Sequence, residues 1–291
     1  MKTEIGRRDF LQIGGLALAS PAVSSLASPP PQAPAAKSGD RIRKAVGWGM
    51  IQEKLSAEDK FRLVKDVGFE GVEVNSRLMK PGAVEPQDLA RASEKIGIPI
   101  HGVSGGSHGD LKGILDEAAI YGATSVLHVV RADPNGSYVE NYRRSQQAIR
   151  EAIPHAEQRR IPILIENVWA TFLIEPLTMA RYIDELNSPF VQAYFDVGNV
   201  MRWGVPQQWI EVLGKRIGKI HVKEYSLKTA MSQGMAKGFD FPMGQGDIQW
   251  NRVREELDKI QFRGWATAEV RGGDRQRLAE ISAEMNGILG L

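Results

Sequence analysis

The chain has 291 residues, of which 42% are hydrophobic and 25% charged, and these are the proportions of an ordinary globular protein with a full apolar core. Its 37 basic and 35 acidic residues leave a formal charge of +2, so neither the net charge nor any basic run favours a nucleic-acid surface. The sequence contains no cysteine, which excludes a disulfide framework and a lipid anchor on an N-terminal cysteine.

The N-terminal segment has the composition of a targeting peptide. Arg7 and Arg8 precede an uncharged run over residues 13–27 that ends in small residues. This pattern resembles a twin-arginine export signal. We therefore expect a signal peptide over residues 1–27, a Pro-rich linker over residues 28–44 and a mature protein in the periplasm. No later apolar run is long enough to span a bilayer, so we expect no stable membrane anchor.

From residue 45 to residue 291 one pattern repeats: a Val- and Ile-rich run, a segment of helical period, then a Gly or Pro stop. The expected helices lie at 56–67, 86–97, 111–122, 138–160, 175–187, 206–215, 249–260 and 274–289. Strict alternation with apolar strands predicts parallel pairing with helices outside. Eight units in about 250 residues predict a single closed (β/α)8 barrel. An open doubly wound sheet is the alternative, but no Gly-rich fingerprint follows the first strand.

Four predicted strands end in a side chain that can bind a metal: Glu166, Asp196, His221 and Glu269. Active sites of barrels lie on the face built by the segments after the strands, and these segments are long here, above all residues 226–248. Carboxylate oxygens with one imidazole suit Mn²⁺, Mg²⁺, Co²⁺ or Zn²⁺. The structural alternative is four polar residues that cap the barrel.

Three short motifs add a family resemblance that covers about residues 45–290. They are Phe195 to Asn199, His221 to Glu224, and Gly244 to Ile248. Together with the four strand-end residues they resemble the sugar isomerase/epimerase branch of the xylose-isomerase-like TIM barrels. The resemblance implies one divalent metal, Mn²⁺ in the first place, held by those four side chains.

The resemblance also implies a reaction. The metal would chelate a carbonyl and a neighbouring hydroxyl of a small sugar or keto-sugar and acidify the hydrogen between them. Glu166 and Glu269 would be the catalytic pair, one removing that proton and the other delivering one through an enediolate. Return of the proton to the same carbon gives an epimer, and return to the adjacent carbon interconverts aldose and ketose.

The expected substrate contacts are His101, Asn199, Lys223 and Arg271. Each has a structural alternative. A lone strand histidine is as often a hydrogen-bonded rim residue, and Lys223 could pair with Glu224. Glu224 could instead orient His221. Glu73 and Arg271 could form a structural ion pair.

The sequence also permits other functions. A metal-dependent lyase or hydrolase acting on a keto-glycoside would share the enolisation step. A sugar-binding module would not need both glutamates. The nuclease branch of the same fold needs a histidine-rich cluster of three zinc ions, whereas the sequence has five histidines and only His221 matches. The sequence also leaves open a homo-oligomer, and the segment Ser104 to Gly109 is favoured as a plain loop over a phosphate cradle.

Overall fold

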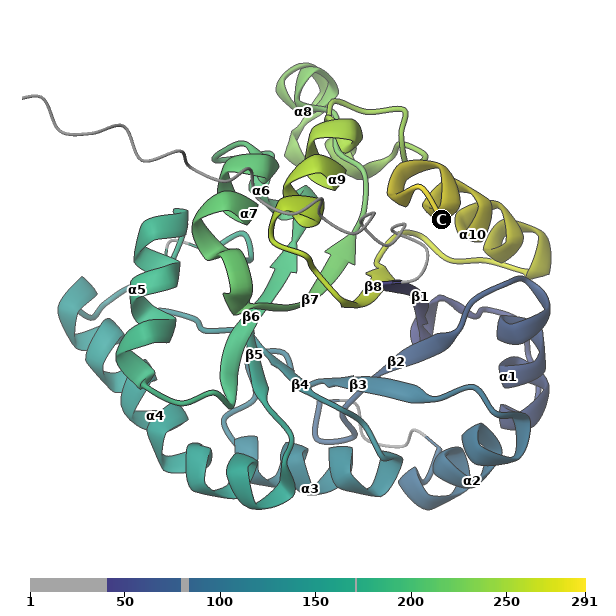
Figure 1. Cartoon of the computed structure of the whole chain (residues 1–291), viewed down its shortest axis with the longest axis horizontal. Coiled ribbons are helices and arrows are strands. Elements are labelled where there is room, and N and C mark those ends of the chain that lie inside the picture. The colour runs from purple at the N-terminus through teal and green to yellow at the C-terminus, as the bar shows by residue number, and fades with distance from the viewer. Residues whose placement is uncertain (1–40, 80–83, 171) are drawn as a thin grey trace, which may run out of the picture. The chain divides into compact units, whose positions relative to one another are not determined.

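The computed structural model describes residues 41–79, 84–170 and 172–291. The predicted signal peptide and almost all of the predicted linker lie outside these residues. The strands are β1 Ile42–Gly47, β2 Gly71–Asn75, β3 Ile100–Ser104, β4 Val126–His128, β5 Ile163–Glu166, β6 Val191–Asp196, β7 Ile217–Val222 and β8 Gly264–Ala268. They close into a parallel barrel in chain order, which confirms the predicted fold (Figure 1).

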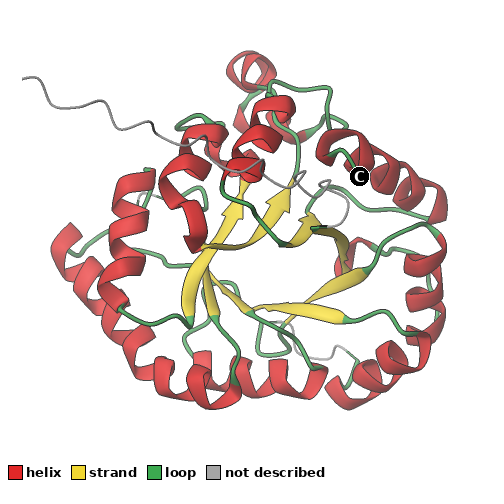
Figure 2. Ribbon diagram, viewed as in Figure 1, coloured by secondary structure: helices red, strands yellow, loops and turns green. Residues whose placement is uncertain are grey.

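Helices surround the strands (Figure 2). They are α1 Ala57–Asp66, α2 Pro86–Ile96, α3 Leu111–Tyr121, α4 Tyr138–Arg159, α5 Pro176–Leu186, α6 Val197–Val200, α7 Pro206–Leu213, α8 Leu227–Gln233, α9 Trp250–Lys259 and α10 Arg275–Leu289. The short 3-10 helices are η2 Trp48–Met50, η3 Gly214–Arg216 and η4 Met235–Phe239. The eight expected helices are all present, whereas α6, α8 and η4 were not predicted. The barrel also begins three residues earlier than expected, at Ile42.

Local signals in the sequence start the helices where they were expected. The Ser56 hydroxyl accepts a hydrogen bond from the Asp59 N–H and caps α1. Ser137 and Glu140 form a reciprocal capping box at α4, so two otherwise unpaired backbone donors are satisfied. These caps explain why helix starts could be predicted within a residue or two.

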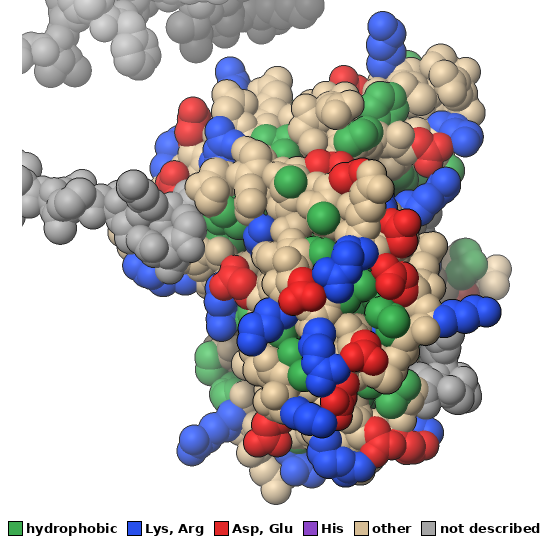
Figure 3. Space-filling view, turned by 90° about the vertical axis from the view of Figure 1, so that its right-hand side faces the viewer, with side chains coloured by type: hydrophobic (Ala, Val, Ile, Leu, Met, Phe, Trp, Pro, Cys, Tyr) green, Lys and Arg blue, Asp and Glu red, His purple; other side chains and the backbone are tan. Residues whose placement is uncertain are grey.

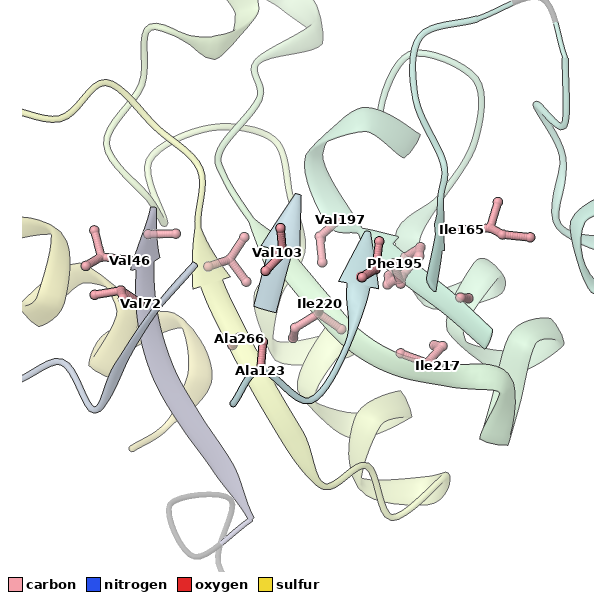
Figure 4. Close-up of a cluster of buried hydrophobic side chains, with 14 of the residues drawn as sticks. Val46, Val72, Val103, Ala123, Ile165, Phe195, Val197, Ile217, Ile220 and Ala266 are labelled. Carbon is pink, nitrogen blue, oxygen red and sulfur yellow. The ribbon is translucent and has the colours of Figure 1, made fainter. Parts of the chain in front are cut away.

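Two apolar layers result from the alternation of side chains along the strands. Val72, Phe195 and Ile220 point outward and pack in the large core between strands and helices (Figure 4). Leu164 and Tyr194 belong to a separate, smaller cluster in the barrel interior. Residues two positions beyond such an interior residue point inward again, toward the barrel mouth.

The surface of the described part carries both signs of charge. The face in Figure 3 shows basic and acidic side chains side by side. Pairs such as Arg62 with Glu58 and Arg275 with Asp66 lie 3.3 and 3.2 Å apart. Within the described ranges, no helix combines the length and apolar character needed to cross a membrane.

Glu224 fastens the long segment after β7 to the barrel. Its side chain is 1% exposed and accepts N–H groups from Gly244 at 2.6 Å and Ile248 at 3.3 Å, together with the Trp250 indole N–H at 2.9 Å. A Cβ at Gly246 would lie 2.5 Å from this carboxylate, so glycine permits the close approach. One buried carboxylate therefore organises the return of this segment into α9.

We expect Glu224→Gln to lower the free energy of unfolding by about 2 kcal/mol, because hydrogen bonds to a charged acceptor are lost and an amide N–H₂ faces other donors. Chemical denaturation followed by circular dichroism measures the change. Glu211→Gln, on the exposed face of α7, is the matched control and should change stability little. Equal stability of Glu224→Gln and the control would contradict the anchoring role.

Candidate metal centre

Four predicted ligands meet at the mouth of the barrel. Glu166 ends β5, Asp196 ends β6, His221 lies near the end of β7 and Glu269 directly follows β8. One candidate ligand atom from each lies within 4.8 Å of the others. The carboxyl ends of neighbouring parallel strands share one rim, which is why residues far apart in sequence converge here.

A polar layer supports this cluster from below. Each ligand lies two residues beyond an interior residue, and those residues are Leu164, Tyr194, Lys219 and Thr267. The Tyr194 hydroxyl donates to Glu73 Oε2 at 2.7 Å and lies 3.0 Å from the Thr267 hydroxyl. Apart from Leu164, this layer contains hydrogen-bonding groups where barrels usually have bulky aliphatic ones, and it lies directly below the ligand layer.

His221 is held between carboxylates on both sides of its ring. Nε2 lies 2.9 Å from Glu73 Oε1, and Nδ1 lies 3.0 Å from Glu166 Oε1. Nδ1 is also 3.5 Å from Glu269 Oε2 and 3.8 Å from Asp196 Oδ2. With Nε2 directed at Glu73, Nδ1 is the ring nitrogen that faces the other three carboxylates, and it is the atom that would bind a metal. The sequence interpretation missed this role of Glu73.

Lys223 contributes the other positive charge at the centre. Its Nζ lies 2.8 Å from Asp196 Oδ2 and 2.5 Å from Glu269 Oε2. The alternative that Lys223 pairs with Glu224 is wrong, because the Glu224 carboxylate is turned toward Gly244 and its neighbours. The alternative that Glu224 orients His221 is wrong for the same reason.

The crowded charges displace the pKa values from their ordinary range. Burial favours a neutral His221, but the Glu73 and Glu269 carboxylates outweigh it and raise the pKa of the imidazole well above its usual value. Burial, together with the other carboxylates, raises the pKa of Asp196. The positive charges of His221 and Lys223 lower the pKa of Glu269. The centre therefore holds Glu269 as an ionised base.

The donor set fits a divalent cation. Asp196 Oδ2 is buried and makes no hydrogen bond among the described residues, and the Lys223 ammonium pairs with it ionically at 2.8 Å. Three carboxylates and one imidazole suit a hard or borderline ion. Glu166, Asp196, His221 and Glu269 would hold it. Glu166 is 8% exposed and Glu269 is 51% exposed, so the site opens on the Glu269 side.

His101 lies below the centre and not at its rim. Its side chain is buried, with Nδ1 3.1 Å from Lys219 Nζ and Nε2 3.0 Å from the Thr267 hydroxyl. Burial and the Lys219 charge lower the pKa of His101 well below its ordinary value. Burial lowers the pKa of Lys219 to about 7. Both ring nitrogens of His101 have protein partners, so the structure supports an interior role for it in place of the expected substrate contact.

Asn199 lies beside the ligand cluster, whereas Arg271 lies outside it. The Asn199 backbone N–H donates to Asp196 Oδ1 at 2.7 Å, and its side-chain amide donates to the Asn167 carbonyl at 3.0 Å. Asn199 therefore steadies a ligand, and its Oδ1 lies 3.5 Å from Lys223 Nζ. Arg271 has an 87% exposed side chain, 3.8 Å from Asp240, and lies outside the ligand cluster.

We expect Glu73→Gln to weaken binding of a divalent ion by roughly 10- to 100-fold, the usual loss when the hydrogen-bond partner of a ligating histidine is removed. Calorimetric titration of the metal-free protein with Mn²⁺ gives the dissociation constant. The control variant Glu94→Gln, on the exposed face of α2, should bind Mn²⁺ with the same dissociation constant as the unaltered protein. An unchanged constant in Glu73→Gln would mean that Glu73 does not orient His221.

Comparison with curated proteins gives partial matches. A protein from Escherichia coli K12, provisionally named an L-ribulose-5-phosphate 3-epimerase, is 28% identical over 115 residues, which are 39% of this chain and 39% of that protein. Its counterpart from Haemophilus influenzae is 27% identical over 120 residues, 41% of either chain. The matched part thus spans well under half of these relatives.

Comparison with solved structures shows the same fold over most of the chain. A D-allulose 3-epimerase from Methylomonas sp. has a TM-score of 0.68 and 16% identity, covering 85% of this chain and 98% of its own. The family described as the xylose isomerase-like TIM barrel matches residues 61–288. Because this match spans most of the closed barrel, the chain belongs to the xylose isomerase-like TIM barrel family.

Proposed function

We propose that the protein is a divalent-metal-dependent sugar isomerase or epimerase that removes a proton alpha to a carbonyl. The observation that carries the proposal is the meeting of Glu166, Asp196, His221 and Glu269 within 4.8 Å at the barrel mouth. The epimerase names of the relatives point in the same direction. The substrate is a small sugar or keto-sugar.

A bound divalent ion, Mn²⁺ in the first place, would supply Lewis acidity toward a sugar carbonyl and its neighbouring hydroxyl. The residues supply the proton transfer. Glu269 is kept ionised by His221 and Lys223 and opens toward solvent, which suits a base that meets the substrate. Glu166, whose Oε1 lies 3.0 Å from His221 Nδ1, is the proposed partner that returns a proton.

Two other functions fit the residues less well. A lyase acting on a keto-glycoside shares the first step, but the relatives reported above carry epimerase names. The nuclease alternative needs several clustered histidines. Within the part of the chain that the structure describes, the ligand cluster contains His221 alone, and His155 pairs with Asp116 on the outer helices.

Export belongs to the same proposal. The Arg7 and Arg8 pair and the uncharged run over residues 13–27 support a signal peptide over residues 1–27 and a periplasmic mature protein. This location favours unphosphorylated sugars as substrates, since sugar phosphates are scarce there.

Metal content tests the ligand assignment. We expect about one divalent ion per mature chain, and we expect Asp196→Ala and His221→Ala to lose it, because three remaining groups make an open and weak chelate. Elemental analysis after dialysis gives the ratio, with Asp88→Ala on the exposed face of α2 as control. Full occupancy in both ligand variants would remove the basis of the proposal.

Isotope exchange tests the chemistry. Incubation in D₂O with free, keto and glycosylated sugars should place deuterium at the carbon next to the carbonyl. Glu166→Gln and Glu269→Gln should each lower turnover by roughly 10²- to 10⁴-fold, the usual contribution of general acid–base catalysis. Metal content is measured in the same samples, because both residues are proposed ligands. A mixture of epimers supports the epimerase and an aldose–ketose pair the isomerase. Release of an aglycone or water supports the lyase, and sugar binding without exchange would contradict all three.

A further inference from the structure

Three polar groups converge in front of Gly102, inside the barrel and below the candidate metal centre. A Cβ built on Gly102 would lie 3.2 Å from Glu73 Oε2, 3.4 Å from Lys219 Nζ and 3.5 Å from Ser125 Oγ. All three side chains are buried. Because Gly102 has no side chain of its own, a small polar molecule can approach these groups at this position.

A β-bulge turns Gly102 toward the interior. The register between β2 and β3 shifts, so that Val72 pairs with Ile100 and Glu73 pairs with Gly102. His101 is the extra residue of the bulge, and its side chain also lies inside the barrel. Two consecutive residues of β3 therefore face the interior. One of them fills its place with an imidazole, and the other brings no side chain at all.

Ser125 is the member of this group that lacks a partner. Its Oγ is buried and makes no hydrogen bond within the described ranges of the chain. Ser125 directly precedes β4 and lies two residues before Leu127, which belongs to the interior cluster, so its side chain also faces the interior. Buried hydroxyl groups in native proteins nearly always pair with protein or with ordered water. The Ser125 hydroxyl thus points to a partner in front of Gly102.

Glu73 and Lys219 show what that partner is. Glu73 Oε2 accepts from the Tyr194 hydroxyl at 2.7 Å, and a carboxylate oxygen can accept a second hydrogen bond. A water molecule in front of Gly102 would donate to Glu73 Oε2, accept from the Ser125 hydroxyl and turn its oxygen to the Lys219 ammonium. Three such polar neighbours are the usual surroundings of a buried water. An ion of either sign would meet a like charge there.

The same water would close a ring of hydrogen bonds through the barrel. The ring runs from Glu73 to Tyr194 at 2.7 Å, to Thr267 at 3.0 Å, to His101 at 3.0 Å and to Lys219 at 3.1 Å. Within the described part of the chain, no direct hydrogen bond or ion pair makes the remaining step from Lys219 to Glu73. Both residues face the position in front of Gly102, so one water spans that step.

We propose that Glu73, Ser125 and Lys219 bind one internal water molecule in front of Gly102, and that this water helps to position Glu73. Glu73 in turn lies 2.9 Å from His221 Nε2, so the water acts on the ligand through two hydrogen bonds. The water site stands on the interior geometry alone, whereas its effect on a metal rests on the proposed function. No bond forms or breaks at the site.

Diffraction from crystals of the full chain at high resolution tests the site. We expect a water peak about 2.6–3.2 Å from Glu73 Oε2 and from Ser125 Oγ. Gly102→Ala puts a methyl group against the site and should remove the peak. In solution, magnetic relaxation dispersion of the water nuclei should then show one long-lived water fewer. Gly109→Ala, in the exposed segment after β3, is the matched control, because its added Cβ meets no heavy atom within 4 Å.

Calorimetric titration with Mn²⁺ tests the effect on the centre. Gly102→Ala and Ser125→Ala should each weaken Mn²⁺ binding by about fivefold, the equivalent of one net hydrogen bond, and Gly109→Ala should leave the dissociation constant unchanged. Ser125→Ala adds no atom and removes only one partner of the water. A packing defect caused by the extra methyl group of Gly102→Ala therefore cannot decide the result.

Absence of the peak, with equal relaxation dispersion in Gly102→Ala and Gly109→Ala, would overturn the water site. A peak together with an unchanged Mn²⁺ dissociation constant in Gly102→Ala and Ser125→Ala would overturn the positioning role. Failure of the unaltered protein to bind Mn²⁺ would count against the proposed function instead. The diffraction and relaxation measurements decide the water site in that case, because they need no metal.

Discussion

The placement of His221 between Glu73 and Glu166 is the interaction on which the rest of the centre depends. Nε2 faces the buried carboxylate on β2, so Nδ1 faces the mouth. A rotated ring would remove the one nitrogen donor from the mouth and leave Glu73 Oε1 buried without its imidazole partner. Glu73 in turn accepts from Tyr194, so the orientation of His221 is fixed by residues from opposite sides of the barrel.

The alternation of inward and outward side chains along the strands connects the orientation of the His221 ring to the fold. An interior layer of Tyr194, Lys219 and Thr267 fills the barrel, and the ligand layer stands two residues higher on the same strands. Beyond the strands, Glu224 ties the returning segment after β7 to the barrel, and this segment carries Phe239 to the edge of the centre. The strands of the barrel thus position the four ligand side chains, while the long segment after β7 positions the neighbouring side chains such as Phe239.

Much of this arrangement could be predicted from sequence because its signals are local. Helical period, Gly and Pro stops and caps such as Ser56 locate the elements, and an acid or histidine at the end of a parallel strand locates a ligand. The pairing of Glu73 with His221 spans 148 residues and depends on the stagger of the closed barrel, which no local pattern records. Glu224 was misinterpreted because its partners arrive 20 or more residues later, in a segment without periodic character.

The most direct measurement of the central claim is the anomalous scattering of crystals soaked in Mn²⁺. The account predicts one strong peak within about 2.0–2.4 Å of an oxygen of Glu166, Asp196 and Glu269 and of His221 Nδ1, the distances usual for such ligands. It also predicts that the Lys223 ammonium leaves its present place 2.8 Å from Asp196 Oδ2, since a bound cation would repel it. A peak elsewhere, or a centre that stays closed by Lys223 at saturating Mn²⁺, would contradict the account.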